Sequence, residues 1–453
     1  MHDQPSFLRG VRCAILVALS LNATARAASA PAVDSAPAVD RTATLRYAVS
    51  DLGTLGGTTS EGNSIDDLGL IGGFASLEGD AAWHATAWLY GLKVDLGTLG
   101  GPNSNVAWPV KNNIGLIAGI AQTANPEPNG ARWSCRSFFP LPQNTGYTCL
   151  GFAWEGGHMR ALGTLGGNNS YATGANDRRE IAGWAENTVR DSANCVAPYQ
   201  YLQFRPVIWG PQRDAIRALP LLAGDSSGSA TALNNRGQVV GISGICDRAV
   251  GRFSARHAVL WENGTIADIG SLGGVAWNTP TAINERGEVV GFSNVSAADG
   301  GAFHAHAFYW SRRTGMRDLG TLPGDTHSQA LGMNNFGDVA GLSCDADFVV
   351  CRAVLWKGGV AIDLNTRRAP GYAKQLIDAQ DVNDFGQITG QAFDADTNTF
   401  PGFRAIPYLA SSRPADAAVE LEFAPAVERR PLGLDARAQL MRRFGIEEGD
   451  LVH

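Results

Sequence analysis

A seven-residue motif, DLGTLGG, recurs along the chain and constrains its fold more than any other feature. It stands at 51–57 and 95–101, and it returns as ALGTLGG at 161–167. Looser copies follow as ALPLLAGD (218–225), DIGSLGG (268–274), DLGTLPGD (318–325) and DLNTRR (363–368). A period of roughly 50 residues is typical of a repeat architecture. Each unit of such an array packs on its neighbours, so a chain of 453 residues needs no single large core.

One unit of the repeat, 268–316, predicts four strands and no helix. Short runs of β-forming residues alternate with tight turns that contain glycine, and no segment has helical periodicity. The predicted strands are 279–284, 288–293, 304–310 and 316–320. Four antiparallel strands with a short crossover to the next set are typical of one propeller blade. The sequence therefore predicts an all-β chain built from four-stranded antiparallel repeats.

Two independent features of the repeat each occur seven times. The first is a turn of the form Asn/Asp-x-x-Gly-x-x-x-Gly, which begins at Asp66, Asn112, Asn176, Asn234, Asn284, Asn334 and Asn383. In the third unit Arg179 replaces the turn glycine, so we expect that turn to be distorted. The second feature is the aromatic residue that ends each third strand, at Trp88, Trp154, Trp209, Trp261, Trp310, Trp356 and Tyr408. Both counts predict a seven-bladed β-propeller.

The two ends of the array predict that the ring is closed. The chain enters with a lone outer-type strand at 46–53 and leaves with a third-type strand at 402–409. If these two pair in one blade, the ring has no exposed sheet edge. The alternative is an open β-solenoid, in which the two ends of the array would not need to supply each other's missing strand.

The repeat resembles a known family. DLGTLGG, the I-N-x-x-G-x-V-V-G hairpin and His306-Ala307-Phe308 are similar to the HAF-type extracellular repeat of bacterial secreted proteins. The resemblance covers about 45–410, although only one unit has a strict His-Ala-Phe. It implies an exported, propeller-like repeat protein, and it carries over no catalytic residues.

The segments outside the repeat fit an exported chain. Residues 1–30 have a positive start, a short apolar run and a small-x-small cleavage site, which together predict a signal peptide. The alternative is a membrane anchor, but the apolar run is short for a bilayer. Residues 31–44 look like a flexible leader, and 411–453 form a tail whose apolar stripe over 434–445 suits a short helix. We expect a secreted or periplasmic protein with no membrane insertion after cleavage.

Charge and basic residues limit the partners. A net charge of -7 with scattered Lys and Arg argues against a nucleic-acid partner. A basic residue lies four positions before the aromatic in most third strands, at His84, Arg205, His257, His306, Arg352 and Arg404. These residues could form a cationic ligand ring or make hydrogen bonds that lock blade to blade. Leu150 interrupts the series in the second unit, which favours the structural interpretation.

Six of the seven cysteines lie beyond the predicted signal peptide, all near loops between second and third strands. An even number in an exported chain indicates disulfides, although six cysteines allow 15 pairings. We predict the pairs Cys135–Cys149, Cys195–Cys246 and Cys344–Cys351. Free or differently paired thiols are the alternative.

Motifs for chemistry are weak. Residues 224–228 match G-x-S-x-G, but they lie in a crossover and lack the strand–turn–helix elbow that this motif needs. We therefore predict no catalytic residues. Asp394, Asp396 and Asn398 have the spacing of a Ca²⁺ loop without its sixth-position glycine or twelfth-position glutamate. A weak Ca²⁺ site is the only cofactor that the sequence suggests.

The loops between second and third strands and the crossovers open on one face, which we call the loop-rich face. Propellers bind partners through such loops. We expect a binding or scaffold module for an extracellular glycan or protein. We predict that its ligand residues ring the channel mouth: Asn105, Trp108, Asn169, Tyr171, Trp277 and His327. The alternatives are a glycan-active hydrolase or lyase and a purely structural surface repeat.

Overall fold

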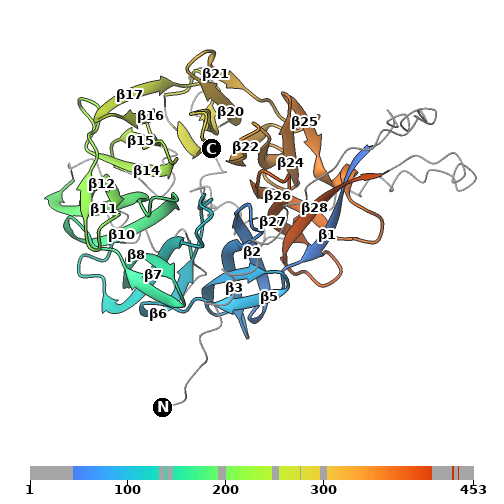
Figure 1. Cartoon of the computed structure of the whole chain (residues 1–453), viewed down its shortest axis with the longest axis horizontal. Coiled ribbons are helices and arrows are strands. Elements are labelled where there is room, and N and C mark those ends of the chain that lie inside the picture. Colours follow the sequence, from blue (N-terminus) through green and yellow to red (C-terminus); the bar gives the residue numbers. More distant parts are fainter. Residues whose placement is uncertain are drawn as a thin grey trace, which may run out of the picture.

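The fold is a closed ring of seven four-stranded antiparallel sheets, a seven-bladed β-propeller (Figure 1). The computed structural model describes residues 44–131, 138–139, 146–191, 200–246, 255–275, 277–295, 304–410, 431–432 and 437. Within these ranges no helix is long and apolar enough to cross a membrane. The predicted signal peptide lies outside the described residues, as does the leader but for Thr44.

Each of the first six blades consists of four consecutive strands. The first three blades are β2 (Gly56–Ile65), β3 (Ile71–Leu77), β4 (Trp83–Leu89), β5 (Leu92–Asp95); β6 (Gly100–Asn105), β7 (Ile117–Pro126), β8 (Tyr147–Glu155), β9 (His158–Ala161); and β10 (Gly166–Ala175), β11 (Ile181–Arg190), β12 (Leu202–Trp209), β13 (Ile216–Ala218). The next three are β14 (Ser227–Leu233), β15 (Val239–Gly244), β16 (His257–Glu262), β17 (Thr265–Gly270); β18 (Thr279–Ile283), β19 (Val289–Asn294), β20 (Ala305–Ser311), β21 (Gly315–Asp318); and β22 (His327–Met333), β23 (Val339–Cys344), β24 (Cys351–Lys357), β25 (Val360–Asp363).

The seventh blade joins the two ends of the array. Its strands are β26 (Gln375–Val382), β27 (Ile388–Phe393), β28 (Gly402–Ala410) and β1 (Thr44–Asp51), and a 3₁₀ turn, η3 (Leu364–Arg367), precedes it. β1 pairs antiparallel with β28 from Thr44 opposite Ala410 to Asp51 opposite Phe403. The predicted closure is confirmed, and the open solenoid is excluded.

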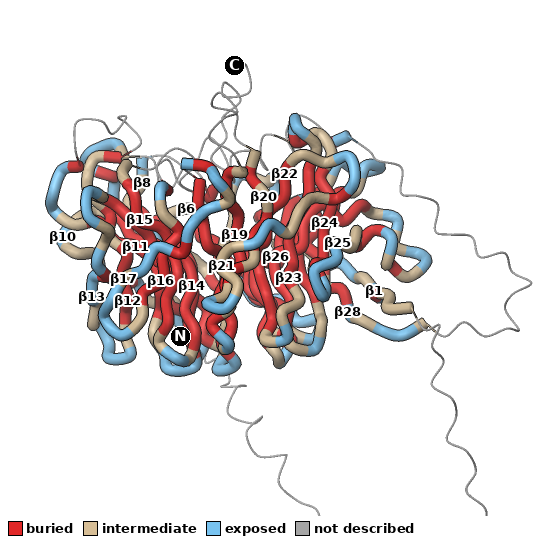
Figure 2. Tube along the Cα trace, turned by 90° about the horizontal axis from the view of Figure 1, so that it is seen from above, coloured by how far each residue is buried: buried red, intermediate tan, exposed pale blue. Residues whose placement is uncertain are grey.

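Three of the third-strand tryptophans, Trp209, Trp261 and Trp356, hold their blade to the crossover that enters it. The indole nitrogen of Trp209 donates to the Gly163 carbonyl oxygen at 2.9 Å, and that of Trp261 donates to Pro220 at 2.7 Å. Both rings are almost fully buried between blades. Buried strands fill the body of the ring, whereas exposed turns and loops line its two rims (Figure 2). The two repeated sequence features, the crossover motif and the aromatic, therefore meet in space.

The seven Asn/Asp turns bind one another around the axis at the rim opposite the loop-rich face, which we call the turn face. Asn234 shows the local role: its Oδ1 accepts from the backbone N–H groups of Arg236 and Gln238, and its Nδ2 donates to the Asn284 carbonyl of the next blade at 2.9 Å. The same inter-blade bond follows from Asn176, Asn284, Asn334 and Asn383.

The residue after each turn Asn or Asp adds a second, complete ring. Its backbone N–H donates to a side-chain oxygen of the corresponding residue in the next blade, at 2.7–3.0 Å. The members of this axial ring are Asp67, Asn113, Asp177, Asn235, Glu285, Asn335 and Asp384. Sequence analysis singled out the turn but missed this ring, because its members share only a short polar side chain.

The third-strand histidines make the hydrogen bonds expected of a structural role, but within a blade. Nδ1 of His84 contacts Asp95, His257 contacts Asp268 and His306 contacts Asp318, at 2.7–2.9 Å. Each aspartate belongs to the fourth strand and opens the next crossover motif. The expected hydrogen bonds to a neighbouring strand are thus present in these three histidines, but they join two strands of one sheet. Arg352 does bond toward the preceding blade, because it donates to the Pro323 carbonyl and pairs with Asp325 in the crossover that enters its blade.

The Cys344–Cys351 disulfide is confirmed; it closes the loop between β23 and β24. Cys149 and Cys246 are also disulfide-bonded. Their predicted partners, Cys135 and Cys195, lie outside the described residues, so these two pairings stay predictions.

Asn234→Ala tests the turn-face bonds. The change removes an acceptor from two backbone N–H groups and a donor from the next blade, so we expect a loss of about 1–3 kcal/mol in the free energy of unfolding. Phe336→Ala, at the exposed corresponding position of the turn in the sixth blade, should change it by less than about 0.5 kcal/mol. Denaturant unfolding of both variants measures the difference, and equal losses would show that the Asn side chain is not what joins the blades.

Candidate functional site

The six predicted ligand residues lie on or next to the inner strands β6, β10, β18 and β22, but they are not an exposed ring. Asn105, Asn169, Tyr171, Trp277 and His327 are each at most 4 % exposed, and Trp108 is half-buried. They fall into two groups. One lies at blades two and three, and the other at blades five and six.

Trp277 and His327 belong to a hydrophobic core. The Trp277 ring meets Phe292 edge-on at 5.5 Å between centroids, and His327 stacks on Phe348 at 4.5 Å. Leu432 of the tail packs in the same cluster, and its backbone N–H donates to the Val349 carbonyl at 2.8 Å. Trp277 is therefore not an exposed aromatic plate, because the tail and the neighbouring loops enclose it.

The group at blades two and three combines stacked aromatics with unpaired polar atoms. Tyr171 stacks on Trp184 at 5.6 Å and meets Trp108 edge-on at 6.5 Å. Asn105 donates its Nδ2 to the Phe138 carbonyl at 3.0 Å. The buried Oδ1 of Asn105 and Nε1 of Trp108 find no hydrogen-bond partner among the described residues. One acceptor and one donor are thus left near the same aromatic cluster, which we call the Tyr171 cluster.

Two carboxylates lie beside this cluster. The Oε2 atom of Glu186 accepts from the backbone N–H groups of Asn168 and Asn169 at 3.0 and 2.9 Å, and Asn168 Nδ2 donates to Glu127 at 3.1 Å. Burial raises the pKa of Glu186 to about 7, and the charge of Glu127 adds to the effect, while the Asn168 and Asn169 amides oppose it. A carboxyl with this pKa can hold or release a proton near neutral pH.

The position of Glu186 nevertheless points to a structural role. In the first blade Asp80 does the same work: its carboxylate accepts from the Thr58 backbone N–H at 2.7 Å and from the Ser76 hydroxyl at 2.5 Å. Both acids hold the first residues of an inner strand. Glu127 and Glu186 are also at most 7 % exposed. A glycan-active enzyme is expected to have an exposed pair of carboxylates. Glu127 and Glu186 do not form such a pair, because both are buried.

The predicted Ca²⁺ residues form a hairpin turn between β27 and β28. Asp394 pairs with Thr399 through two backbone hydrogen bonds, and its carboxylate accepts from the Asp396 N–H at 3.1 Å. Lys374 Nζ lies 3.6 Å from the same carboxylate, while Asn398 takes the left-handed conformation at φ 53°. In the part of the chain that the structure describes, no group of three His, Cys, Asp or Glu side chains could hold a metal ion.

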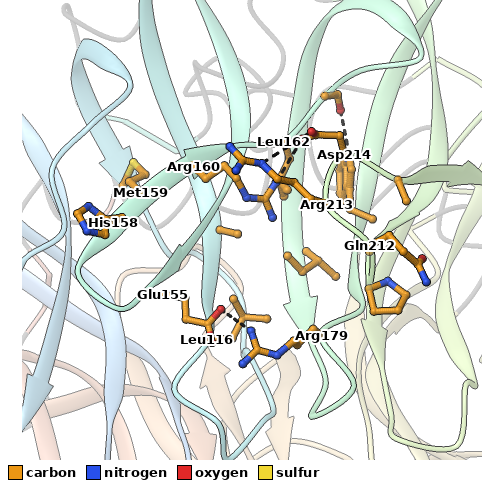
Figure 3. A pocket seen from close by; sticks show the side chains of 17 residues that line it. Leu116, Glu155, His158, Met159, Arg160, Leu162, Arg179, Gln212, Arg213 and Asp214 are labelled. Carbon is orange, nitrogen blue, oxygen red and sulfur yellow. Dashed lines mark hydrogen bonds and ion pairs between the residues drawn. The ribbon is translucent and has the colours of Figure 1, made fainter. Parts of the chain in front are cut away.

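A concave site lies at the turn face, between blades two and three (Figure 3). This cavity, which we call the rim pocket, has a volume of about 490 Å³. Leu162, Ile181 and Trp209 are among its buried apolar wall residues. Charged side chains surround them, from the β8–β9 turn, the β10–β11 turn and the β12–β13 turn: Glu155, Arg160, Arg179, Arg213 and Asp214.

Arg179 builds one wall of the rim pocket. The residue has φ 63°, close to the 71–88° of the turn glycines in the other six units. Its N–H donates to the Asn176 carbonyl at 3.1 Å, as a turn glycine would, so the expected distortion of this turn is wrong. The side chain reaches Glu155 at 2.5 Å (Figure 3). The missing glycine was the one sequence signal of this pocket.

No family model matches the chain, and no curated protein matches it.

Glu186→Gln tests the buried carboxyl by pH dependence. The folded pKa of about 7 lies above the unfolded value of 4.5, so the folded state binds the proton more tightly. The wild-type chain should therefore lose stability as pH rises from about 4.5 through about 7. The glutamine keeps an acceptor for the strand amides and removes the titration, so its melting temperature should fall less over this range.

The exposed Glu78→Gln variant is the control, and it should follow the wild-type pH profile. If the profile of Glu186→Gln also coincides with that of the wild type, Glu186 does not carry a raised pKa.

Proposed function

We propose that this chain is an exported propeller that binds an extracellular glycan through its loop-rich face, beside the Tyr171 cluster. The closed ring is a rigid scaffold, which suits a binding module. The Cys344–Cys351 disulfide supports the inference that the chain resides in an oxidising compartment. The HAF-like repeat supports export to the periplasm or the cell exterior.

The observation that carries the proposal is the unpaired acceptor and donor at the Tyr171 cluster. Buried polar atoms are seldom left without hydrogen bonds, so each one needs an account. Among the described residues, Asn105 Oδ1 and Trp108 Nε1 lack partners within the chain. A sugar hydroxyl both donates and accepts, and the half-buried Trp108 is the ring of this cluster that can meet the apolar face of a sugar, since Tyr171 and Trp184 are buried.

An enzyme and a protein-binding scaffold are the other candidates. Glu186, with its pKa of about 7, is the feature near the Tyr171 cluster, among the described residues, that favours a glycan-active hydrolase or lyase. Its carboxylate is occupied by strand amides, which favours binding over catalysis. A protein partner could pair with the same two atoms through its backbone N–H and C=O groups, so the binding assay has to separate it from a sugar.

Trp108→Phe tests the glycan site, because it removes the indole donor and keeps an aromatic ring. The chain from residue 31 onward is assayed on an array of neutral and uronic-acid oligosaccharides, and binding is quantified by calorimetry. We expect affinity for the bound oligosaccharide to fall about tenfold in this variant, the usual effect of one hydrogen bond. Melting temperature should stay close to that of the wild type.

Trp83→Phe is the matched control, since Trp83 is also half-buried and stacks on Phe74 in the first blade at 4.2 Å. Its affinity should equal that of the wild type. Absence of any oligosaccharide binding, or equal affinities in both variants, would contradict the proposal. Release of cleaved sugar that stops in Glu186→Gln would favour the enzyme instead.

A further inference from the structure

The rim pocket has the size of a small-molecule site and lies on the face away from the Tyr171 cluster. Its volume of about 490 Å³ falls within the range of known ligand pockets, roughly 300–1,000 Å³. The Trp209 ring is held in place, because its indole nitrogen donates to the Gly163 carbonyl at 2.9 Å. The pocket therefore has a fixed apolar wall before any ligand arrives.

Two arginines of the rim pocket share one distant carboxylate. Arg160 Nη1 lies 4.0 Å from an Asp214 oxygen, and Arg213 Nε lies 3.8 Å from the other oxygen of the same group. Both distances are too long for hydrogen bonds. Within the described ranges neither guanidinium has a side-chain hydrogen bond, and Figure 3 shows the two side chains reaching toward Asp214. Their N–H donors are available to a ligand.

The third arginine is not available in the same way. Arg179 is bound to Glu155 at 2.5 Å, and this pair closes the opposite wall of the pocket. The two positive charges of Arg160 and Arg213 are thus balanced only in part, by the one negative charge of Asp214. Two guanidinium groups near one another repel, so an anion placed between them is favoured.

We propose that the rim pocket binds a small organic acid, whose carboxylate is held by Arg160 and Arg213. The planar guanidinium presents parallel N–H donors that match the two oxygens of a carboxylate. The apolar body of the acid packs against Leu162, Ile181 and Trp209. A bare inorganic anion would leave this apolar wall uncovered, which is why the ligand needs both parts.

The third unit provides this pocket through its departures from the repeat. In the other six units the turn residue equivalent to Arg179 is a glycine with no side chain to form a wall. Gly210 opens the β12–β13 turn, and a Cβ there would lie 2.4 Å from the Arg179 carbonyl oxygen, so the close approach of these two turns requires glycine. Arg179 and Gly210 thus lie against each other and form parts of one local site.

Benzoate tests the proposal on the full chain, with benzamide as its uncharged isostere. We expect saturable benzoate binding in ligand-observed NMR, and no saturable binding of benzamide. The double variant Arg160→Gln with Arg213→Gln should weaken benzoate binding by at least about tenfold, since hydrogen bonds to charged groups are lost. Arg313→Gln, an exposed arginine in the β20–β21 turn, should leave it unchanged.

Three results would overturn the proposal: no benzoate binding, equal binding by the double variant, or equal binding of benzamide. Inorganic phosphate that binds as tightly as benzoate would also overturn it, in favour of a simple anion site. Both arginines lie at the surface, and a melting temperature equal to that of the wild type shows that the double variant is folded. None of these results depends on the glycan site, because the Trp108→Phe variant keeps the rim pocket intact.

Discussion

The inter-blade hydrogen bonds at the turn face are the interaction on which the rest of the structure depends. Each turn Asn fixes its own hairpin through two backbone N–H groups, and most of them also donate to the next blade. The following residue completes the axial ring from Asp67 to Asp384 and back to Asp67. The backbone N–H groups that follow the turn Asn and Asp residues lie outside the strand ladders, so they need partners from a neighbouring blade or from water. A ring of seven short polar side chains supplies them.

In the outer part of several blades, side-chain contacts join the third strand to the fourth. The residues at these positions differ from blade to blade. A histidine on the third strand pairs with the aspartate of the fourth in the first, fourth and fifth blades. In the second blade both members are replaced, since Leu150 stands in place of the basic residue and Ala161 in place of the aspartate. No unpaired charge is left by this double replacement, which explains how one blade tolerates the change.

Much of the fold could be predicted from the sequence because its signals are local and periodic. The strands predicted at 279–284 and 304–310 correspond to β18 (Thr279–Ile283) and β20 (Ala305–Ser311). The closing pair was predicted because each end lacked the strand that the other supplied. The Cys344–Cys351 bond was predicted because its cysteines flank one short loop.

The environments of the site residues could not be predicted in the same way. Counting along an inner strand places Trp277 at the correct end of its blade, but Leu432 packs in the same cluster from a tail far along the chain. The rim pocket depends on three turns that are far apart in sequence. Arg179 was visible as an exception, but nothing in the sequence showed that Arg160 and Arg213 would lie near a common carboxylate.

Hydrogen–deuterium exchange of the two closing strands tests the central claim, that the ring is a single closed unit, most directly. If β1 and β28 close it, peptides covering 44–51 and 402–410 should exchange as slowly as the inner strands, because their amides open only with global unfolding. Exchange of the 44–51 peptide within seconds, while the inner strands remain protected, would contradict the closed ring.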